Sequence, residues 1–166
     1  IRKFNDAELS TLAEDMIESM HYYSGVGLAA NQIGSLRRVC VVQLPEEDVA
    51  TVLINLEITR KEGAREVTEG CLSLPGWQGR ITRAEKVWAR ATDLGGQPVR
   101  YRGVTDLLAQ ALEHECDHLD GKLYIDYVQS PEDLYEVEPG AEEESEGEDP
   151  NQQGVAGERT GAVTEL

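Results

Sequence analysis

Residues 105–121 read TDLLAQALEHECDHLDG, and this segment predicts a helix around which the rest of the chain is organised. Thr105 is a residue type that favours the N-cap, and Gly121 suits the position just after the last turn. The apolar positions of the segment recur at helical spacing, at Leu107, Leu108, Ala111, Leu112 and Leu119. His114 and His118 are four residues apart, so both imidazoles lie on one face of the helix and can bind one metal ion.

The sequence from His114 to His118 is an H-E-x-x-H motif. Glu115 follows the first histidine, where a carboxylate can accept a proton from a water molecule on the metal. Because the helix has its own apolar side and a cap at each end, the motif favours a metal site over two unrelated histidines. His21 is assigned to the end of an earlier helix, with no function.

A catalytic metal of this type has three protein ligands and one open position. In the extended motif a third histidine follows the second by six residues, but this position is Tyr124, which disfavours that pattern. A zinc peptidase of the two-His, one-Glu type takes a glutamate about twenty residues downstream as its third ligand. Glu136 and Glu138 lie at that distance, although no helix is predicted to hold them.

A cysteine is the other alternative for the third ligand. Cys40 lies in an apolar run and is predicted to be strand core, and Cys116 lies on a different face of the helix from the histidines. Cys71 stands in EGCLSLP, residues 69–75, where glycine and proline indicate a rigid irregular segment. Cys71 is therefore the preferred cysteine ligand.

Patterns upstream predict a helix and several strands. Leu9, Leu12, Met16 and Met20 form one apolar stripe on a helix expected over about residues 6–22. Apolar or alternating runs predict strands at 39–44, 52–59, 65–68 and 86–92, with 99–102 as the second arm of a hairpin. The segment GVGLAANQIG, residues 25–34, is not a phosphate loop and is predicted to be an irregular loop.

Composition bounds the functions that are open to the chain. Its 166 residues are enough for one domain with an appendage, and its net charge is −17. Residues 132–166 hold twelve acidic residues and one basic residue, so 131–166 is predicted to be a disordered acidic tail after a catalytic domain over 1–130. Without a basic patch, no direct nucleic-acid binding is expected. No transmembrane or signal segment is evident, and the odd number of cysteines favours a reducing compartment.

Three segments together resemble peptide deformylases, enzymes that remove the formyl group from the initiator N-formylmethionine of new polypeptides. They are residues 25–34, residues 69–75 and HECDHLDG at 114–121, and RAEKV at 83–87 is similar too. The resemblance covers roughly residues 1–128. It implies an α+β fold, with small mixed or antiparallel sheets packed around the metal-binding helix. The family usually has about twenty further residues, including a strand, before the first helix, so we expect an unpaired sheet edge here.

The resemblance also implies roles for particular residues. Cys71, His114 and His118 are implied as ligands of one divalent metal ion, Fe²⁺ by preference, with Zn²⁺, Ni²⁺ or Co²⁺ as alternatives. Glu115 is implied as the general acid and base for attack by a metal-bound hydroxide. Gln32 and the backbone N–H of Leu72 are implied as donors to the formyl oxygen, and Gly27 as a backbone contact to the bound peptide.

The methionine side chain of the substrate needs an apolar slot. Val26, Leu107 and Ala111 are candidates from their loop and helix positions, with plain core packing as the alternative. Glu69 and Arg83 are expected to form an ion pair near the site.

The expected partners are N-formylmethionyl nascent peptides. Contact with the ribosome is expected to be brief or to avoid the tail, because ribosomal RNA repels an acidic segment. The expected compartment is the bacterial cytoplasm, with an organelle as the alternative. Two other functions stay open: a zinc peptidase of the two-His, one-Glu type, and a truncated, non-catalytic homologue that binds peptides.

Overall fold

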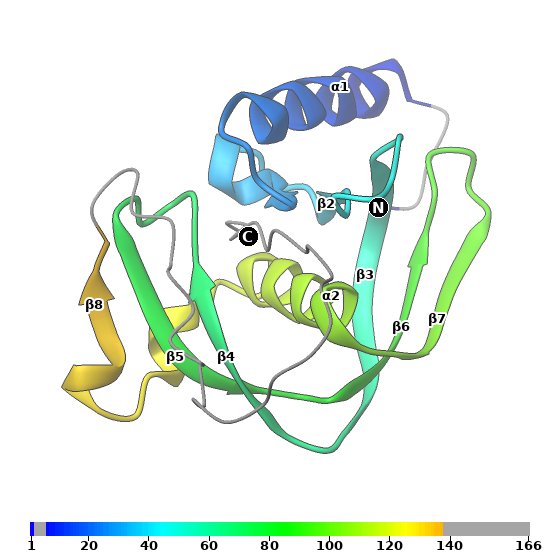
Figure 1. Cartoon of the computed structure of the whole chain (residues 1–166). Coiled ribbons are helices and arrows are strands. Elements are labelled where there is room, and N and C mark those ends of the chain that lie inside the picture. Colours follow the sequence, from blue (N-terminus) through cyan, green and yellow to red (C-terminus); the bar gives the residue numbers. More distant parts are fainter. Residues whose placement is uncertain (2–5, 138–166) are drawn as a thin grey trace, which may run out of the picture.

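The structure is a computed structural model that describes residue 1 and residues 6–137 (Figure 1). Its helices and strands, in chain order, are α1 (Ala7–Tyr22), β1 (Gly27–Ala29), η1 (Ala30–Ile33), β2 (Val39–Val42), β3 (Thr51–Glu62), β4 (Arg65–Gly70), β5 (Trp77–Arg83), β6 (Lys86–Thr92), β7 (Pro98–Val104), α2 (Asp106–Leu119), η2 (Tyr124–Tyr127), η3 (Pro131–Asp133) and β8 (Leu134–Glu136). Neither α-helix of this part of the chain has the length and apolar character that a bilayer crossing requires.

The strands form two antiparallel sheets, which confirms the predicted α+β class. The larger sheet has the order β1-β2-β3-β6-β7, and the smaller has the order β4-β5-β8. In Figure 1, α2 runs between the sheets, and α1 lies over β2 at the outside of the molecule. Strands β1 and β4 are both edge strands, so each has one side without a partner strand among the described residues.

Helix α2 is the centre of the molecule, as the sequence predicts. Ten consecutive residues, from Ala109 to His118, are buried, so its polar side is enclosed as well as its apolar side. The helix packs against β1, β2, β3 and β6. Gly121 follows its end with a φ of 76°, which is the left-handed conformation that a glycine adopts without strain. Side chains that α2 presents are therefore held by packing on all sides.

Replacing Leu112 by Ala should test this packing. Leu112 is fully buried in the core between α2 and the larger sheet, so its truncation leaves a cavity. We expect the free energy of unfolding, measured by urea titration, to fall by about 2–5 kcal/mol. The control is Leu36→Ala, because Leu36 is 97% exposed. Equal losses in the two variants would contradict the placement of α2.

The first helix and most strands agree with the sequence patterns. The predicted stripe of α1 packs on β1 and β2, with Leu9, Met16 and Met20 buried and Leu12 partly buried. The hairpin of β6 and β7 is also confirmed.

Three strands were not predicted, namely β1, β5 and β8. Residues 25–34 contain the short edge strand β1 and the 3₁₀ turn η1 rather than a loop. Strand β5 gives almost no apolar signal, because its buried positions are Gln78, Gly79, Ile81 and Arg83. Periodicity of apolar residues cannot reveal a strand that buries polar groups.

The expectation that a disordered tail begins at residue 131 was wrong. Residues Leu134–Glu136 form β8, which completes the smaller sheet by pairing with β5. Leu134 packs on the cluster around Tyr124, and Asp133 forms an ion pair with Arg80 at 3.1 Å. Apolar packing, an ion pair and strand pairing with β5 together hold this acidic segment. The rest of the predicted tail, residues 138–166, lies outside the described residues.

Candidate metal centre

Three predicted ligands converge in the core. Cys71 follows the end of β4, and His114 and His118 lie one turn apart on α2. The Cys71 Sγ atom lies 3.1 Å from His118 Nε2, which lies 3.1 Å from His114 Nε2. All three potential ligand atoms lie within 4.8 Å of one another, and all three residues are buried. This is the one cluster of at least three potential ligands in the described part of the chain.

The charges of these groups suit a bound cation. Burial by itself raises the pKa of the Cys71 thiol, but hydrogen bonds from His114 and His118 outweigh burial and lower this pKa to about 6. The thiolate is therefore the stable form at neutral pH. A thiolate and two imidazoles are soft and borderline donors, which suit Fe²⁺ or Zn²⁺ better than Mg²⁺ or Ca²⁺.

Glu115 is an unusual buried carboxylate. It is fully buried, and neither of its carboxylate oxygens has a hydrogen-bond partner among the described residues. Burial raises its pKa to about 7, against the opposing effect of His114 and His118. An unpaired buried carboxylate is costly, so a group that interacts with it is expected beside the three ligands. A metal ion with its water molecule fits this requirement.

Gly27 packs directly on Glu115. A Cβ atom at residue 27 would overlap Oε1 of Glu115 and would lie 2.9 Å from its Cδ. The neighbouring atom is a carboxylate held inside the core, so it has little room to retreat. Glycine is required here because of this close approach.

Gly27→Ala should therefore reduce turnover strongly with a smaller effect on folding. The added methyl group displaces the Glu115 carboxylate, and a misplacement of about 1 Å costs about 100-fold in rate. Turnover of a formylated peptide, the substrate that the resemblance implies, measures the effect. The matched control is Gly34→Ala, since no atom lies within 4 Å of a Cβ at Gly34, although its φ of 87° disfavours alanine. Full activity of Gly27→Ala would contradict the contact.

Gln32 lies at the rim of the three-residue cluster. Its Oε1 accepts a hydrogen bond from the Ala29 N–H at 2.7 Å, which turns the amide nitrogen toward the cluster. Nε2 lies 3.8 Å from Cys71 Sγ and donates to Ser73 Oγ at 3.1 Å. The N–H of Leu72 makes no hydrogen bond to any described residue. The Gln32 amide nitrogen and the Leu72 N–H are therefore two hydrogen-bond donors beside Cys71.

The expected ion pair of Glu69 and Arg83 is confirmed. Arg83 donates Nε and Nη2 to the two oxygens of Glu69, at 2.7 Å and 2.9 Å, and both side chains are buried. Glu69 Oε2 also accepts from Nδ1 of His114 at 2.9 Å. Burial opposes ionisation of Glu69, but Arg83 and His114 prevail and lower its pKa. The carboxylate thus orients the first histidine of the motif.

The other candidate ligands lie elsewhere. Cys40 is fully buried in β2, and Cys116 contacts Arg38 and the Leu56 carbonyl on another side of α2. Glu136 is an exposed residue of β8, and Glu138 lies outside the described residues. The Tyr124 hydroxyl donates to the Trp77 carbonyl.

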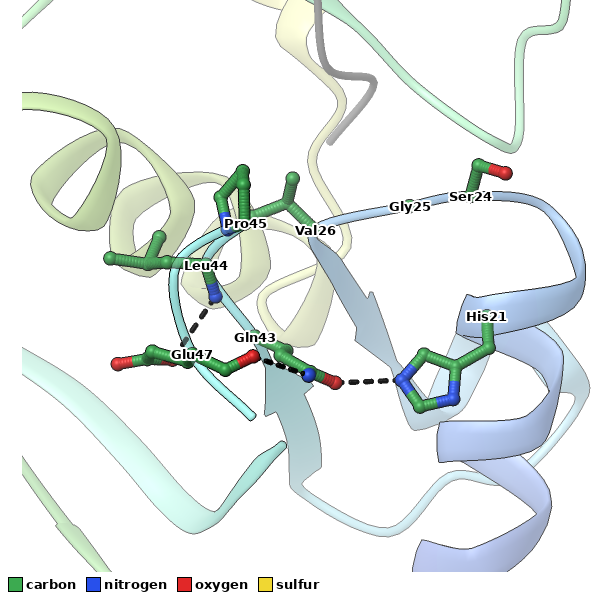
Figure 2. Close-up of a pocket in the computed structure, with 8 residues that line it drawn as sticks. All are labelled: His21, Ser24, Gly25, Val26, Gln43, Leu44, Pro45 and Glu47. Carbon is green, nitrogen blue, oxygen red and sulfur yellow. Dashed lines mark hydrogen bonds between the residues drawn. The ribbon is translucent and has the colours of Figure 1, made fainter. Parts of the chain in front are cut away.

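Val26, Leu107 and Ala111 belong to one apolar cluster, where Val26 and Ala111 are buried and Leu107 is partly buried. A separate pocket of about 290 Å³ opens between the end of α1 and the segment after β2 (Figure 2). Val26 lines this pocket, but Leu107 and Ala111 do not. His21 lies in its wall and donates to Gln43 Oε1 at 2.6 Å.

Sequence reasoning missed Asp117 and Tyr127. Asp117 accepts hydrogen bonds from Arg83 and from the Tyr127 hydroxyl. The spacing held a signal, because Asp117 is three residues after His114 and so lies on the same side of α2. Nothing in the sequence indicates that Tyr127 turns back toward the helix.

Comparisons with known proteins identify the family of the chain. The polypeptide deformylase family model matches residues 1–133. A peptide deformylase of Dehalococcoides mccartyi (strain CBDB1) is 51% identical over 137 residues, which make up 82% of this chain and 81% of that protein.

Solved structures are similar too. A peptide deformylase from Legionella pneumophila superposes with a TM-score of 0.74 at 42% identity, over 80% of this chain and 78% of that one. One from Synechococcus elongatus, solved in complex with actinonin, has a TM-score of 0.75 at 35% identity, over 80% of this chain and 71% of that one.

Peptide deformylases are metalloenzymes that remove the formyl group from N-terminal formylmethionine. The comparisons support neither the two-His, one-Glu peptidase nor a non-catalytic peptide-binding module. Since the family model covers most of the chain and a relative is 51% identical over 137 residues, the chain belongs to the polypeptide deformylase family.

Proposed function

We propose that Cys71, His114 and His118 hold the catalytic divalent ion of this deformylase. The observation that carries the proposal is the convergence of these three buried donors beside Glu115, whose carboxylate has no other described partner. When bound, the ion supplies Lewis acidity, which polarises the formyl group and acidifies water. Proton transfer, stabilisation of charge and peptide binding are carried out by residues of the chain.

Glu115 is the proposed proton carrier. It accepts the proton of the attacking water and delivers it to the leaving amine of the peptide. Its buried position supports this role, because a pKa of about 7 lets one carboxylate take up and release a proton near neutral pH. Its two free oxygens leave it open to both partners.

Gln32 and the Leu72 N–H are the proposed donors to the formyl oxygen. This oxygen gains negative charge when water adds to the carbon, and fixed donors stabilise that charge. The bond from Ala29 N–H to Gln32 Oε1 supports the role, because it fixes which end of the amide faces the site. Both donors lie next to Cys71, so they would be close to an ion held by that residue.

Strand β1 is the proposed docking edge for the peptide. Val26 O accepts from Gln43 N, and Leu28 is opposite Val41, so Gly27 falls at a position whose backbone groups point away from β2. An extended peptide can pair with this edge by strand addition. The methionine side chain then enters the apolar cluster of Val26, Leu107 and Ala111.

We infer that the native ion is Fe²⁺, with Zn²⁺, Ni²⁺ and Co²⁺ as substitutes. The thiolate ligand supports a sulfur-accepting ion. We place the reaction in the bacterial cytoplasm, on nascent peptides during brief contact with the ribosome. The bacterial source of the relatives and the three free, buried cysteines support this setting.

The test is anaerobic purification with metal analysis, followed by turnover of formyl-Met-Ala-Ser. We expect about one equivalent of ion per chain and release of formate, with Fe²⁺ giving the fastest rate after reconstitution. Release of formate that persists after complete chelation would overturn the metal assignment. Faster turnover with Zn²⁺ than with Fe²⁺ would overturn the choice of ion alone.

A further inference from the structure

Arg83 is held by two carboxylates from different elements. At one end it donates to both oxygens of Glu69 from β4. At the other end its Nη1 donates to Oδ2 of Asp117 from α2, at 2.5 Å. The side chains of Arg83 and Glu69 are no more than 1% exposed. The guanidinium therefore has little freedom to turn once both carboxylates are in place.

Tyr127 fixes the outer end of this arrangement. Its hydroxyl donates to Oδ1 of Asp117 at 2.9 Å, so both oxygens of Asp117 are engaged. Its ring lies over the Arg83 guanidinium, 4.9 Å from the centroid, which is a cation–π distance. Burial and the neighbouring Asp117 raise the pKa of Tyr127 to about 12, so the hydroxyl stays protonated and remains a donor.

The inner end of the same chain of contacts reaches a candidate metal ligand. Glu69 Oε2 accepts from Arg83 Nη2 and from His114 Nδ1, each at 2.9 Å. A hydrogen bond at Nδ1 fixes the tautomer and the ring plane, so that Nε2 faces the ion. The orientation of His114 thus depends on where Arg83 holds Glu69.

We propose that Asp117 and Tyr127 are positioning residues of the metal centre, which act on His114 through Arg83 and Glu69. Neither is one of the three converging donors, and their side chains contact each other and Arg83. The inference rests on the proposed ligand set, and it adds that metal affinity is controlled from the surface end of a buried chain of polar contacts. A group bonded directly to a metal ligand, as Glu69 is to His114, contributes about 10–100-fold to metal affinity, and Asp117 and Tyr127 act through that group.

Tyr127→Phe is the first test, with Tyr124→Phe as the matched control. Both tyrosines belong to η2 and each donates one hydroxyl hydrogen bond, but the Tyr124 hydroxyl bonds to the Trp77 carbonyl, outside the chain of contacts. The probe is Co²⁺ added anaerobically to metal-free protein, with a chelator as competitor. We expect Tyr127→Phe to weaken Co²⁺ affinity about 10-fold and Tyr124→Phe to change it less than 2-fold. Equal affinities in wild type and Tyr127→Phe would overturn the proposal.

Asp117→Asn provides a second test, because it keeps the shape and removes the charge. We expect a loss of Co²⁺ affinity at least as large as that of Tyr127→Phe. In the Zn²⁺-loaded protein, the Nδ1–H proton of His114 should exchange faster in both variants than in Tyr124→Phe, as measured by NMR. Unchanged exchange together with unchanged affinity would overturn the proposal. If Asp117→Asn fails to fold, Tyr127→Phe decides alone.

These measurements are independent of the enzymatic reaction. If wild type binds Co²⁺ but releases no formate, the proposed function fails and the positioning role can still hold. If wild type is active and both variants bind Co²⁺ normally, only the positioning role fails.

Discussion

Replacing Cys71 by Ala is expected to abolish tight metal binding and, with it, turnover of formylated peptides. The variant keeps two of the three converging donors and loses the only negative charge among them. Residues that merely orient a ligand are worth about 10–100-fold in affinity, so loss of a ligand should exceed about 100-fold. Competition between metal-free protein and a chelator for Co²⁺ measures this loss.

Cys116→Ala is the matched control for this experiment. Cys116 lies between the two histidines in sequence, but its side chain points to Arg38 and the Leu56 carbonyl. We expect metal content and turnover close to those of wild type. A variant at Cys71 that retained one equivalent of metal would show that another residue is the third ligand, and the site would have to be redrawn.

Glu115→Gln should give the second large loss, in the catalytic step rather than in metal binding. The amide has the size of the carboxylate but cannot accept and return a proton, so kcat should fall by about 100- to 10,000-fold. Metal content should stay at the wild-type level, since Glu115 is not one of the three converging donors. Formate release with formyl-Met-Ala-Ser and metal analysis of the same sample separate the two effects.

Two outcomes for Glu115→Gln would contradict this prediction. Turnover equal to that of wild type, in a sample with full metal content, would refute the proton-transfer role. Loss of the metal would instead place the carboxylate among the ligands.

The sequence predicts those elements whose apolar residues follow a period. Helix α2 and strand β6 both bury an apolar set at regular spacing, and both were found at the expected places. Strand β5 was missed because its buried positions include Gln78 and Arg83. The carboxylates that pair with Arg83 come from other elements, which no local pattern shows. Strand β8 was missed because acidic composition outweighed the contribution of Leu134.

The residues of the candidate site also fall into two groups: those that local sequence predicts and those that only tertiary structure brings together. The histidines and Glu115 are adjacent in sequence, so helical spacing alone places them together. For Cys71 the residues alone give only an argument by elimination, and the family resemblance adds the rest, because Cys71 meets α2 through tertiary structure. For Asp117 the sequence offers only its helical spacing from His114, and for Tyr127 it offers nothing, because both residues act through tertiary contacts around the buried Arg83.

The close contact between Gly27 and Glu115 has a consequence for inhibitor design. Every substitution at residue 27 adds a Cβ atom that overlaps the carboxylate. A compound that binds the main chain of Gly27 would therefore contact a residue that cannot be replaced by a larger one without displacing Glu115. A resistant strain that changed this residue would impair its own enzyme. Escape from such a drug would have to come from elsewhere, through changed uptake, higher expression or substitutions around the proposed methionine slot.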